Sequence, residues 1–200
     1  MKKVFIDGSA GTTGLRICGR LERRSDLHLV ILPNELRKDV SARRDALNSA
    51  DIAFLCLPDD AAIEAVSFID NHDTVVIDTS TAHRTNPDWQ YGFPELAGFR
   101  QRVASAKRIA NPGCHASGFI ALVESLVRNG IIPSSAQLSA FSLTGYSGGG
   151  KKMIAEYDEN LNVKANAVAQ PNSSDSGIDA SDASLRSSIY LGGRQYALAQ

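Results

Sequence analysis

The sequence has little of what marks several large classes of protein. Its three cysteines are widely spaced in 200 residues, with no Cys-x-x-Cys pair, which argues against a disulfide framework or a zinc site and favours a reducing compartment. A formal net charge of −1 offers no basic field for nucleic acid or an anionic membrane surface. The longest apolar run, residues 52–57, is too short to span a bilayer. We therefore expect a cytoplasmic protein without a metal, a nucleic-acid partner or a membrane partner.

Short apolar strands alternate with helical patterns in the first half of the chain. We predict strands over residues 3–6, 28–32, 52–57 and 74–78, and helices over 13–24, 37–48 and after Pro58. The run at 52–57 is apolar throughout, which is typical of a parallel strand covered on both faces. Strands and helices at this spacing predict right-handed βαβ units, and therefore an α/β fold.

The second half is less regular. An amphipathic helix is expected after residue 114, with Gly130 as its stop. Beyond it we predict a strand, a glycine-rich turn, a helix and a long loop, over residues 137–144, 145–150, 152–161 and 171–188 respectively. We place a domain boundary near Asn111, which separates residues 1–110 from residues 111–200.

A glycine-rich segment joins the first strand to the first helix. It consists of Gly8, Ser9, Ala10, Gly11, Thr12, Thr13 and Gly14. Its G-x-x-G-x-x-G spacing is a variant of the dinucleotide fingerprint, in which glycines let the backbone approach a pyrophosphate and the N–H groups at the helix start bind its charge. A plain tight turn would also favour glycine, but the position at the start of a βαβ series predicts dinucleotide binding.

The residues after the second strand normally decide between the two nicotinamide cofactors. A carboxylate there holds the ribose hydroxyls, whereas basic side chains accept a 2′-phosphate. Residues 32–38 offer both, with Glu35 beside Arg37 and Lys38. The stretch leans slightly towards NADP with Arg37 as a ligand, and a solvated charged loop is an equally good interpretation.

Cys114 is the candidate nucleophile. It stands between a Pro-Gly turn and the amphipathic helix, so its sulfur is expected near the unpaired N–H groups at the helix start, a placement that favours the thiolate. The alternative is a small buried residue at a helix start. Cys18 and Cys56 fit that alternative, because they lie in a helix face and a buried strand. A turn before Cys114 is expected to present its side chain.

A rival nucleophile is Ser147, in the sequence Gly-Tyr-Ser-Gly-Gly that matches the elbow of serine hydrolases. The hydrolase order requires an acid and then a histidine after the serine. All four histidines precede Ser147, which argues against a hydrolase. A loop that holds the substrate or the nicotinamide suits Ser147 better.

Residues 78–84 end a strand on the side where α/β proteins bind ligands. Arg84 is suited to pair with a phosphate or a carboxylate. His83 is either an acid–base group or a solvated loop residue.

Taken together, these motifs resemble the N-acetyl-gamma-glutamyl-phosphate reductase family, especially its shorter bacterial type. The matching stretches run in family order: Gly8 to Gly14, Phe54 to Asp60, Asp78 to Arg84, Tyr91 to Leu96, Asn111 to Cys114, and Gly145 to Lys151. Aspartate-semialdehyde dehydrogenase looks like a more distant relative with the same thioester chemistry. A reductase of that kind for another acyl phosphate, and a non-catalytic NADP-binding fragment, remain alternatives.

The resemblance implies a Rossmann-type parallel-sheet domain that binds NADP, followed by an α+β catalytic domain, in a homo-oligomer. It implies that Cys114 attacks N-acetylglutamyl phosphate, that phosphate leaves, and that hydride transfer from NADPH yields the semialdehyde. Beside the glycine-rich segment and Arg37, the expected cofactor contacts are Pro58, Ser80 and Gly148. The expected substrate contacts are Arg84, Asn111 and Ser147.

Family members continue well past the stretch that matches residues 196–200. Their acid–base histidine lies in that continuation, and no residue here matches it. We therefore expect the 200 residues to be an incomplete copy of a longer enzyme.

Overall fold

The computed structural model describes residues 1–145, 148 and 154–155. The chain divides into two compact units, residues 1–137 and 138–200. The named helices and strands all lie in the first unit. The boundary near Asn111 stays a prediction.

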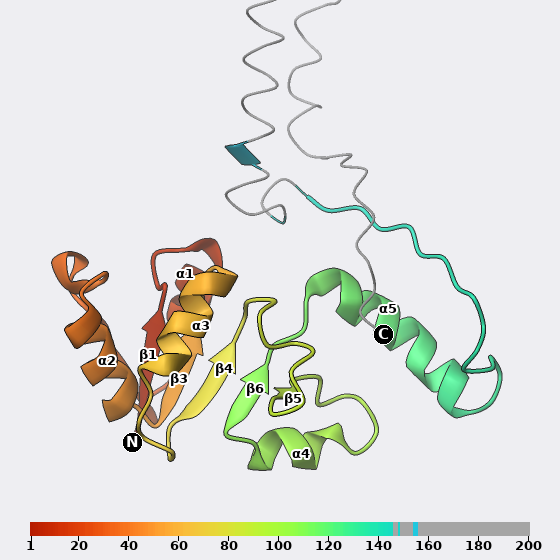
Figure 1. Ribbon diagram of the computed structural model, residues 1–200, viewed down its shortest axis with the longest axis horizontal. Coiled ribbons are helices and arrows are strands. Elements are labelled where there is room, and N and C mark those ends of the chain that lie inside the picture. The colour runs from red at the N-terminus through yellow and green to blue at the C-terminus, as the bar shows by residue number, and fades with distance from the viewer. Residues whose placement is uncertain (146–147, 149–153, 156–200) are drawn as a thin grey trace, which may run out of the picture. The chain divides into compact units, whose positions relative to one another are not determined.

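A parallel sheet of six strands forms the centre of the first unit (Figure 1). Its order is β2-β1-β3-β4-β6-β5. The strands are β1 (Lys2–Asp7), β2 (Leu27–Val30), β3 (Ile52–Leu55), β4 (Val75–Asp78), β5 (Gln90–Tyr91) and β6 (Arg108–Ala110). All five pairings are parallel, which confirms the predicted α/β class.

Helices connect the strands. They are α1 (Thr12–Leu21), η1 (Asn34–Leu36, a single 3₁₀ turn), α2 (Val40–Ser49), α3 (Asp59–Ser67), α4 (Phe99–Ser105) and α5 (Cys114–Arg128). The helix predicted over 37–48 begins later, because Asp39 caps α2 by accepting a hydrogen bond from the Ala42 N–H at 2.8 Å. Gly130, at φ +70°, ends α5 as predicted.

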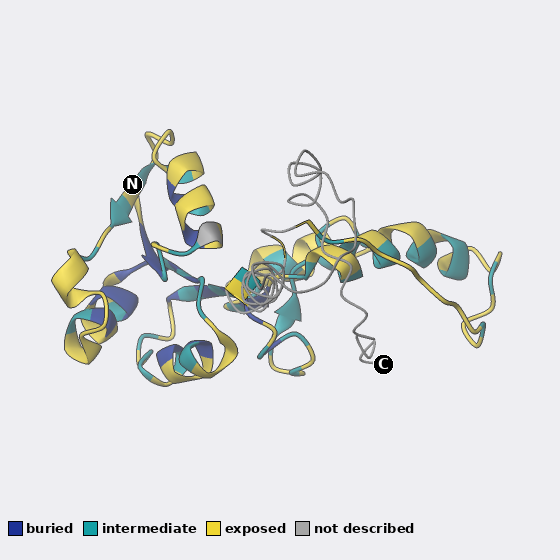
Figure 2. Cartoon of the chain, turned by 90° about the horizontal axis from the view of Figure 1, so that it is seen from above, coloured by how far each residue is buried: buried dark blue, intermediate teal, exposed yellow. Residues whose placement is uncertain are grey.

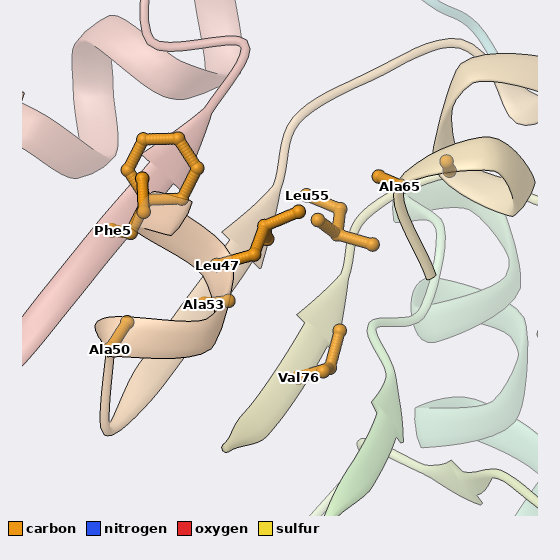
Figure 3. Packing of buried hydrophobic residues seen from close by; sticks show 9 residues of the cluster. Phe5, Leu47, Ala50, Ala53, Leu55, Ala65 and Val76 are labelled. Atoms are coloured by element: carbon orange, nitrogen blue, oxygen red, sulfur yellow. The ribbon is translucent and has the colours of Figure 1, made fainter. Parts of the chain in front are cut away.

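Side chains alternate across β1 and build a core on each face of the sheet. Phe5 points to a cluster with Leu47 of α2, Leu55 of β3 and Ala65 of α3 (Figure 3). Val4 and Ile6 pack on the other face against Cys18 of α1. Figure 2 shows buried residues along the central strands. Because both faces are covered, the middle of β1 (residues 4–6) and all of β3 are apolar, as expected of central parallel strands.

The sequence prediction was incomplete in one respect, wrong in another, and in part falls outside the described residues. β5, α4 and β6 were not predicted, because strands of two and three residues and a helix of seven carry no readable periodicity. The strand predicted over 137–144 is wrong: residues 137–143 belong to no helix or strand, since no described segment pairs with them. Most of the helix predicted over 152–161, and the whole loop predicted over 171–188, lie outside the described residues.

Candidate active site

The order of the strands reverses between β1 and β3. Strands later in the chain extend the sheet beyond β3, whereas β2 lies on the far side of β1. The helices that follow these two strands cover opposite faces, α1 on one and α3 on the other. Ligands of open α/β sheets bind at the carboxyl ends of the strands flanking such a point. The glycine-rich segment and the loop from Cys56 to Pro58 both lie there.

Two of the predicted glycines are required by close packing of the backbone. Gly8 has a φ of +83°, and a Cβ there would lie 2.2 Å from the carbonyl oxygen of Cys56. A Cβ on Gly14 would lie 2.3 Å from the carbonyl oxygen of Gly8 and 2.7 Å from the Cα of Ser9. Without a Cβ at these positions, Gly8 packs against the loop after β3 and the start of α1 packs against the end of β1.

The beginning of α1 is suited to an anion. Gly11 is its N-cap and offers no side-chain hydrogen bond, and no acidic residue stands in the first turn. The N–H groups of a first turn have no partner within the helix and carry the positive end of its dipole. Thr13 of this turn is exposed. The segment therefore fits a pyrophosphate. Pro58 is the exposed N-cap of α3 on the other side of the reversal point.

A buried ion pair lies at the carboxyl end of β1. Asp7 Oδ2 accepts from Nε of Arg43 at 3.1 Å, and both residues are buried. Arg43 Nη1 also donates to Glu64 of α3 at 3.0 Å. Burial raises the pKa of Asp7, and the Arg43 charge opposes that rise. The sequence shows no sign of this pair, because the partner lies thirty-six positions away.

Asp78 organises the loop that follows β4. Its buried carboxylate accepts hydrogen bonds from the Ser80 N–H at 2.9 Å and the Ser80 hydroxyl at 2.7 Å, and it contacts His83 Nδ1 at 2.7 Å. The His83 ring stacks on Trp89 with centroids 4.0 Å apart. A solvated His83 is therefore wrong, because the ring is buried. The Ser80 side chain, predicted to contact the cofactor, is buried in this network.

Arg84 connects this loop to the segment before α5. Its Nε donates to the carbonyl of Asn111 at 3.0 Å, and its Nη2 donates to the carbonyl of Thr79 at 3.1 Å. The predicted substrate contacts Arg84 and Asn111 are thus neighbours. Asn111 is exposed, and its N–H donates to the carbonyl of Asp78 at 2.7 Å.

Cys114 is the first residue of α5, and it is exposed. The turn before it presents the side chain, as the sequence predicted. The other two cysteines differ: Cys18 is buried, and burial raises its pKa. Burial also raises the pKa of Cys56 to about 11, which leaves very little thiolate at neutral pH.

Of the remaining predicted site residues, the structure describes Arg37 and Gly148 but not Ser147. Arg37 is exposed at the end of η1. Its positive charge partly opposes the rise that burial causes in the pKa of the Cys18 thiol. Gly148 is exposed and belongs to the second unit. Ser147 lies outside the described residues. Among the residues that the structure describes, no helix is long and apolar enough to cross a membrane.

Comparison with known proteins gives relatives of two kinds. An N-acetyl-gamma-glutamyl-phosphate reductase of Brucella anthropi is 52% identical over 159 residues, which is 78% of this chain and 51% of the relative. An N-acetyl-gamma-glutamyl-phosphate reductase 2 of Nostoc sp. is 50% identical over 157 residues, or 78% of this chain and 49% of the relative. The chain thus spans about half the length of the curated relatives it matches.

The solved structures agree on the fold. Aspartate semialdehyde dehydrogenase from Francisella tularensis superposes with a TM-score of 0.57 at 15% identity, covering 86% of this chain and 52% of that one. The Vibrio cholerae aspartate semialdehyde dehydrogenase II gives 0.56 at 16%, covering 88% and 55%. The family model of the semialdehyde dehydrogenase NAD-binding domain matches residues 3–106, just over half of the chain. The chain therefore belongs to the semialdehyde dehydrogenase family through its NAD-binding domain.

Proposed function

We propose that this chain carries the nucleotide site and the nucleophile of an enzyme that reduces N-acetyl-γ-glutamyl phosphate to N-acetylglutamate 5-semialdehyde. The observation that carries the proposal is the placement of Cys114. Cys114 is exposed and is the first residue of α5, which follows β6 after the turn of residues 111–113. The carboxyl end of β6 lies beside that of β4. The reductases named above, which are 52% and 50% identical to this chain over the matched residues, support the choice of substrate.

NADP is the proposed cofactor, and its reduced form supplies a hydride when bound. Residues 8–14 would hold the pyrophosphate with backbone N–H groups, since the glycines leave no Cβ in the way. Arg37 would pair with the 2′-phosphate. Pro58, Ser80 and Gly148 complete the proposed cofactor contacts, with Ser80 acting through its backbone carbonyl, because its N–H and its hydroxyl both donate to Asp78.

Cys114 would act first, as a thiolate that attacks the carbonyl carbon of the acyl phosphate. A C–S bond forms as the bond from that carbon to the phosphate oxygen breaks, and inorganic phosphate leaves with the electron pair. Hydride addition to the thioester carbon then gives a thiohemiacetal. Its collapse breaks the C–S bond, returns the thiolate to Cys114 and releases the aldehyde.

Three residues are proposed to contact the substrate: Arg84, Asn111 and Ser147. Nε and Nη2 of Arg84 already donate to backbone carbonyls, so Nη1, the nitrogen beside Gly113, is the one we assign to an anionic group of the substrate. We place the enzyme in the cytoplasm as a homo-oligomer, and the exposed free thiol of Cys114 suits a reducing compartment.

The reverse reaction tests this proposal. N-Acetylglutamate semialdehyde, NADP and phosphate are incubated with the purified enzyme in the longer form that the sequence leads us to expect, and NADPH formation is followed by absorbance. We expect a rate that requires phosphate, is lost in Cys114→Ala, and exceeds the rate with aspartate semialdehyde. Preference for aspartate semialdehyde would contradict the substrate, and a phosphate-dependent rate that survives Cys114→Ala would contradict the nucleophile.

A further inference from the structure

The segment that delivers Cys114 is held from outside α5. No residue of α5 is fully buried within the described part of the chain. The helix start also lacks a side-chain cap, because its N-cap is Gly113. Residues 111–113, which we name the delivery turn, are instead bonded to the end of β4 and the loop after it.

Arg84 provides the side-chain part of that attachment. One guanidinium group donates to the carbonyl of Asn111 in the delivery turn and to the carbonyl of Thr79 in the loop after β4, at 3.0 and 3.1 Å. Two donors in a rigid planar fork fix the distance and the angle between the two segments, which one flexible ammonium group does not do. Arg84 thus joins two strand ends with a single side chain.

The guanidinium group of Arg84 also explains why residue 113 is a glycine. Its φ of −78° and ψ of 153° suit any residue, so the backbone does not require glycine there. A Cβ at this position would lie 2.7 Å from Nη1 of Arg84 and 3.4 Å from its Cζ. The delivery turn is therefore packed directly on the arginine.

The loop that carries Arg84 is itself anchored. Asp78 holds Ser80 and His83 from the buried end of β4. Asp59, in the first turn of α3, accepts from the N–H of Thr81 at 2.8 Å and from the Thr81 hydroxyl. With both ends of the loop attached to regular elements, Arg84 extends from a fixed base.

We propose that Arg84 is a positioning residue for the nucleophile: its guanidinium clamps the delivery turn and so fixes the place of Cys114 before any substrate binds. The inference rests on the proposed function in taking Cys114 as the nucleophile. It differs from a substrate contact because it operates in the free protein. Gly113 is its steric counterpart, a residue kept small by the guanidinium.

A double-mutant cycle on the free protein tests the clamp. The variants are Arg84→Ala, Gly113→Ala and the pair together, and the readout is the rate at which iodoacetamide modifies Cys114, measured by mass spectrometry of its peptide. Matched controls are Arg100→Ala, an exposed arginine of α4, and Gly118→Ala, where a Cβ in α5 meets nothing within 4 Å. NADP affinity and circular dichroism report whether each variant is folded.

When the helix start is loosened, its N–H groups no longer lie beside the sulfur. The interaction of a helix end with a nearby negative charge corresponds to roughly a two- to fivefold change in rate. We expect Arg84→Ala and Gly113→Ala each to slow the modification by about that factor, whereas both controls leave it unchanged. In the Arg84→Ala background, Gly113→Ala should have only a small further effect, since the atom it strikes is gone. The intrinsic cost of alanine at an N-cap is present in both backgrounds and cancels.

Chemical rescue separates the clamp from a general structural role. Added guanidinium ion, below denaturing concentration, should restore the rate of Arg84→Ala but not that of Gly113→Ala. Equal effects of Gly113→Ala in both backgrounds, or an unchanged rate in Arg84→Ala, would overturn the proposal. If Arg84→Ala fails to fold, Arg84→Lys takes its place in the same cycle: a smaller effect of Gly113→Ala in that background than in the wild type supports the clamp, and equal effects refute it. A reductase assay without turnover would count against the proposed function only.

Discussion

The carboxylate of Asp78 is fully buried, and its Oδ2 lies 2.7 Å from Nδ1 of His83. The same carboxylate accepts both the N–H and the hydroxyl of Ser80, and the His83 ring stacks on Trp89. The Asp78 side chain at the end of β4 therefore fixes the loop that carries Arg84. Through His83 it also holds Trp89, the residue before β5.

Replacing Asp78 by asparagine should weaken this network. Hydrogen bonds to a charged group contribute about 1.5–3 kcal/mol, so we expect the free energy of unfolding to fall by about that amount in Asp78→Asn. The measurement is denaturant unfolding, with Asp73→Asn as the control because that side chain is almost fully exposed. A loss no greater than that of the control would contradict the role of Asp78.

The Asp7–Arg43 pair predicts a pH-dependent cost. Arg43→Met leaves the Asp7 carboxylate buried without its counter-charge, and breaking such a pair costs about 3–5 kcal/mol at neutral pH. Burial raises the pKa of Asp7 above 3.8, so the protonated form is favoured in the fold. The contribution of Asp7 to stability is therefore greatest below pH 3.8 and is lost as the pH rises through the raised pKa.

It follows that the destabilisation by Arg43→Met should grow from acidic to neutral pH. Unfolding measured across that range checks this, with Arg44→Met as the control because Arg44 is its exposed neighbour in α2. A loss of unfolding free energy that is the same at all pH values, or equal to that of the control, would show that Arg43 does not stabilise the buried Asp7 carboxylate.

Gly14 and Gly19 of α1 form a matched pair. A Cβ on Gly14 would lie 2.3 Å from a backbone oxygen, whereas a Cβ on Gly19 meets nothing within 4 Å. We expect Gly14→Ala to displace the glycine-rich segment and weaken NADP binding more than about tenfold. Gly19→Ala should leave binding unchanged and stabilise the helix by about 0.5–1 kcal/mol. Titration calorimetry measures the NADP affinity of each variant, and denaturant unfolding measures its stability. Equal affinities of the two variants would contradict the role of the glycine-rich segment in binding NADP.

The cofactor preference should depend on Arg37. We expect NADPH to bind more tightly than NADH, with a difference that shrinks as the salt concentration rises, because a phosphate charge is paired. Arg37→Ala should remove most of the difference, whereas Arg100→Ala should not. Equal affinities of the two cofactors for the wild-type protein at low salt would show that Arg37 is part of a solvated loop.

Sequence reasoning succeeded where the signal is local. Short runs of apolar residues located β1, β3 and β4, and the glycine-rich segment of residues 8–14 located the start of α1. Turn chemistry alone indicated that Cys114 is presented to solvent, because a Pro-Gly turn precedes a helix.

What the sequence missed depends on contacts between distant segments. Nothing local shows that Asp7 pairs with Arg43, that His83 is buried on Trp89, or that Arg84 holds the carbonyl of Asn111. The Asp7–Arg43 pair forms only when α2 packs on the sheet, and the Arg84–Asn111 pair only when β4 and β6 bring their carboxyl ends together. The strand predicted over 137–144 was wrong for a related reason: a stretch of mixed polar and apolar residues becomes a strand only where a neighbouring segment pairs with it.

The central claim is that Cys114 forms a thioester, and the acyl group on that sulfur can be measured directly. The purified protein is mixed with N-acetyl-γ-glutamyl phosphate without NADPH, quenched in acid and mapped by mass spectrometry, while released phosphate is assayed. We predict an N-acetylglutamyl adduct on the Cys114 peptide, phosphate release that matches it, and neither in Cys114→Ala. An adduct on Cys18, Cys56 or Ser147, or phosphate release without any adduct, would contradict the account.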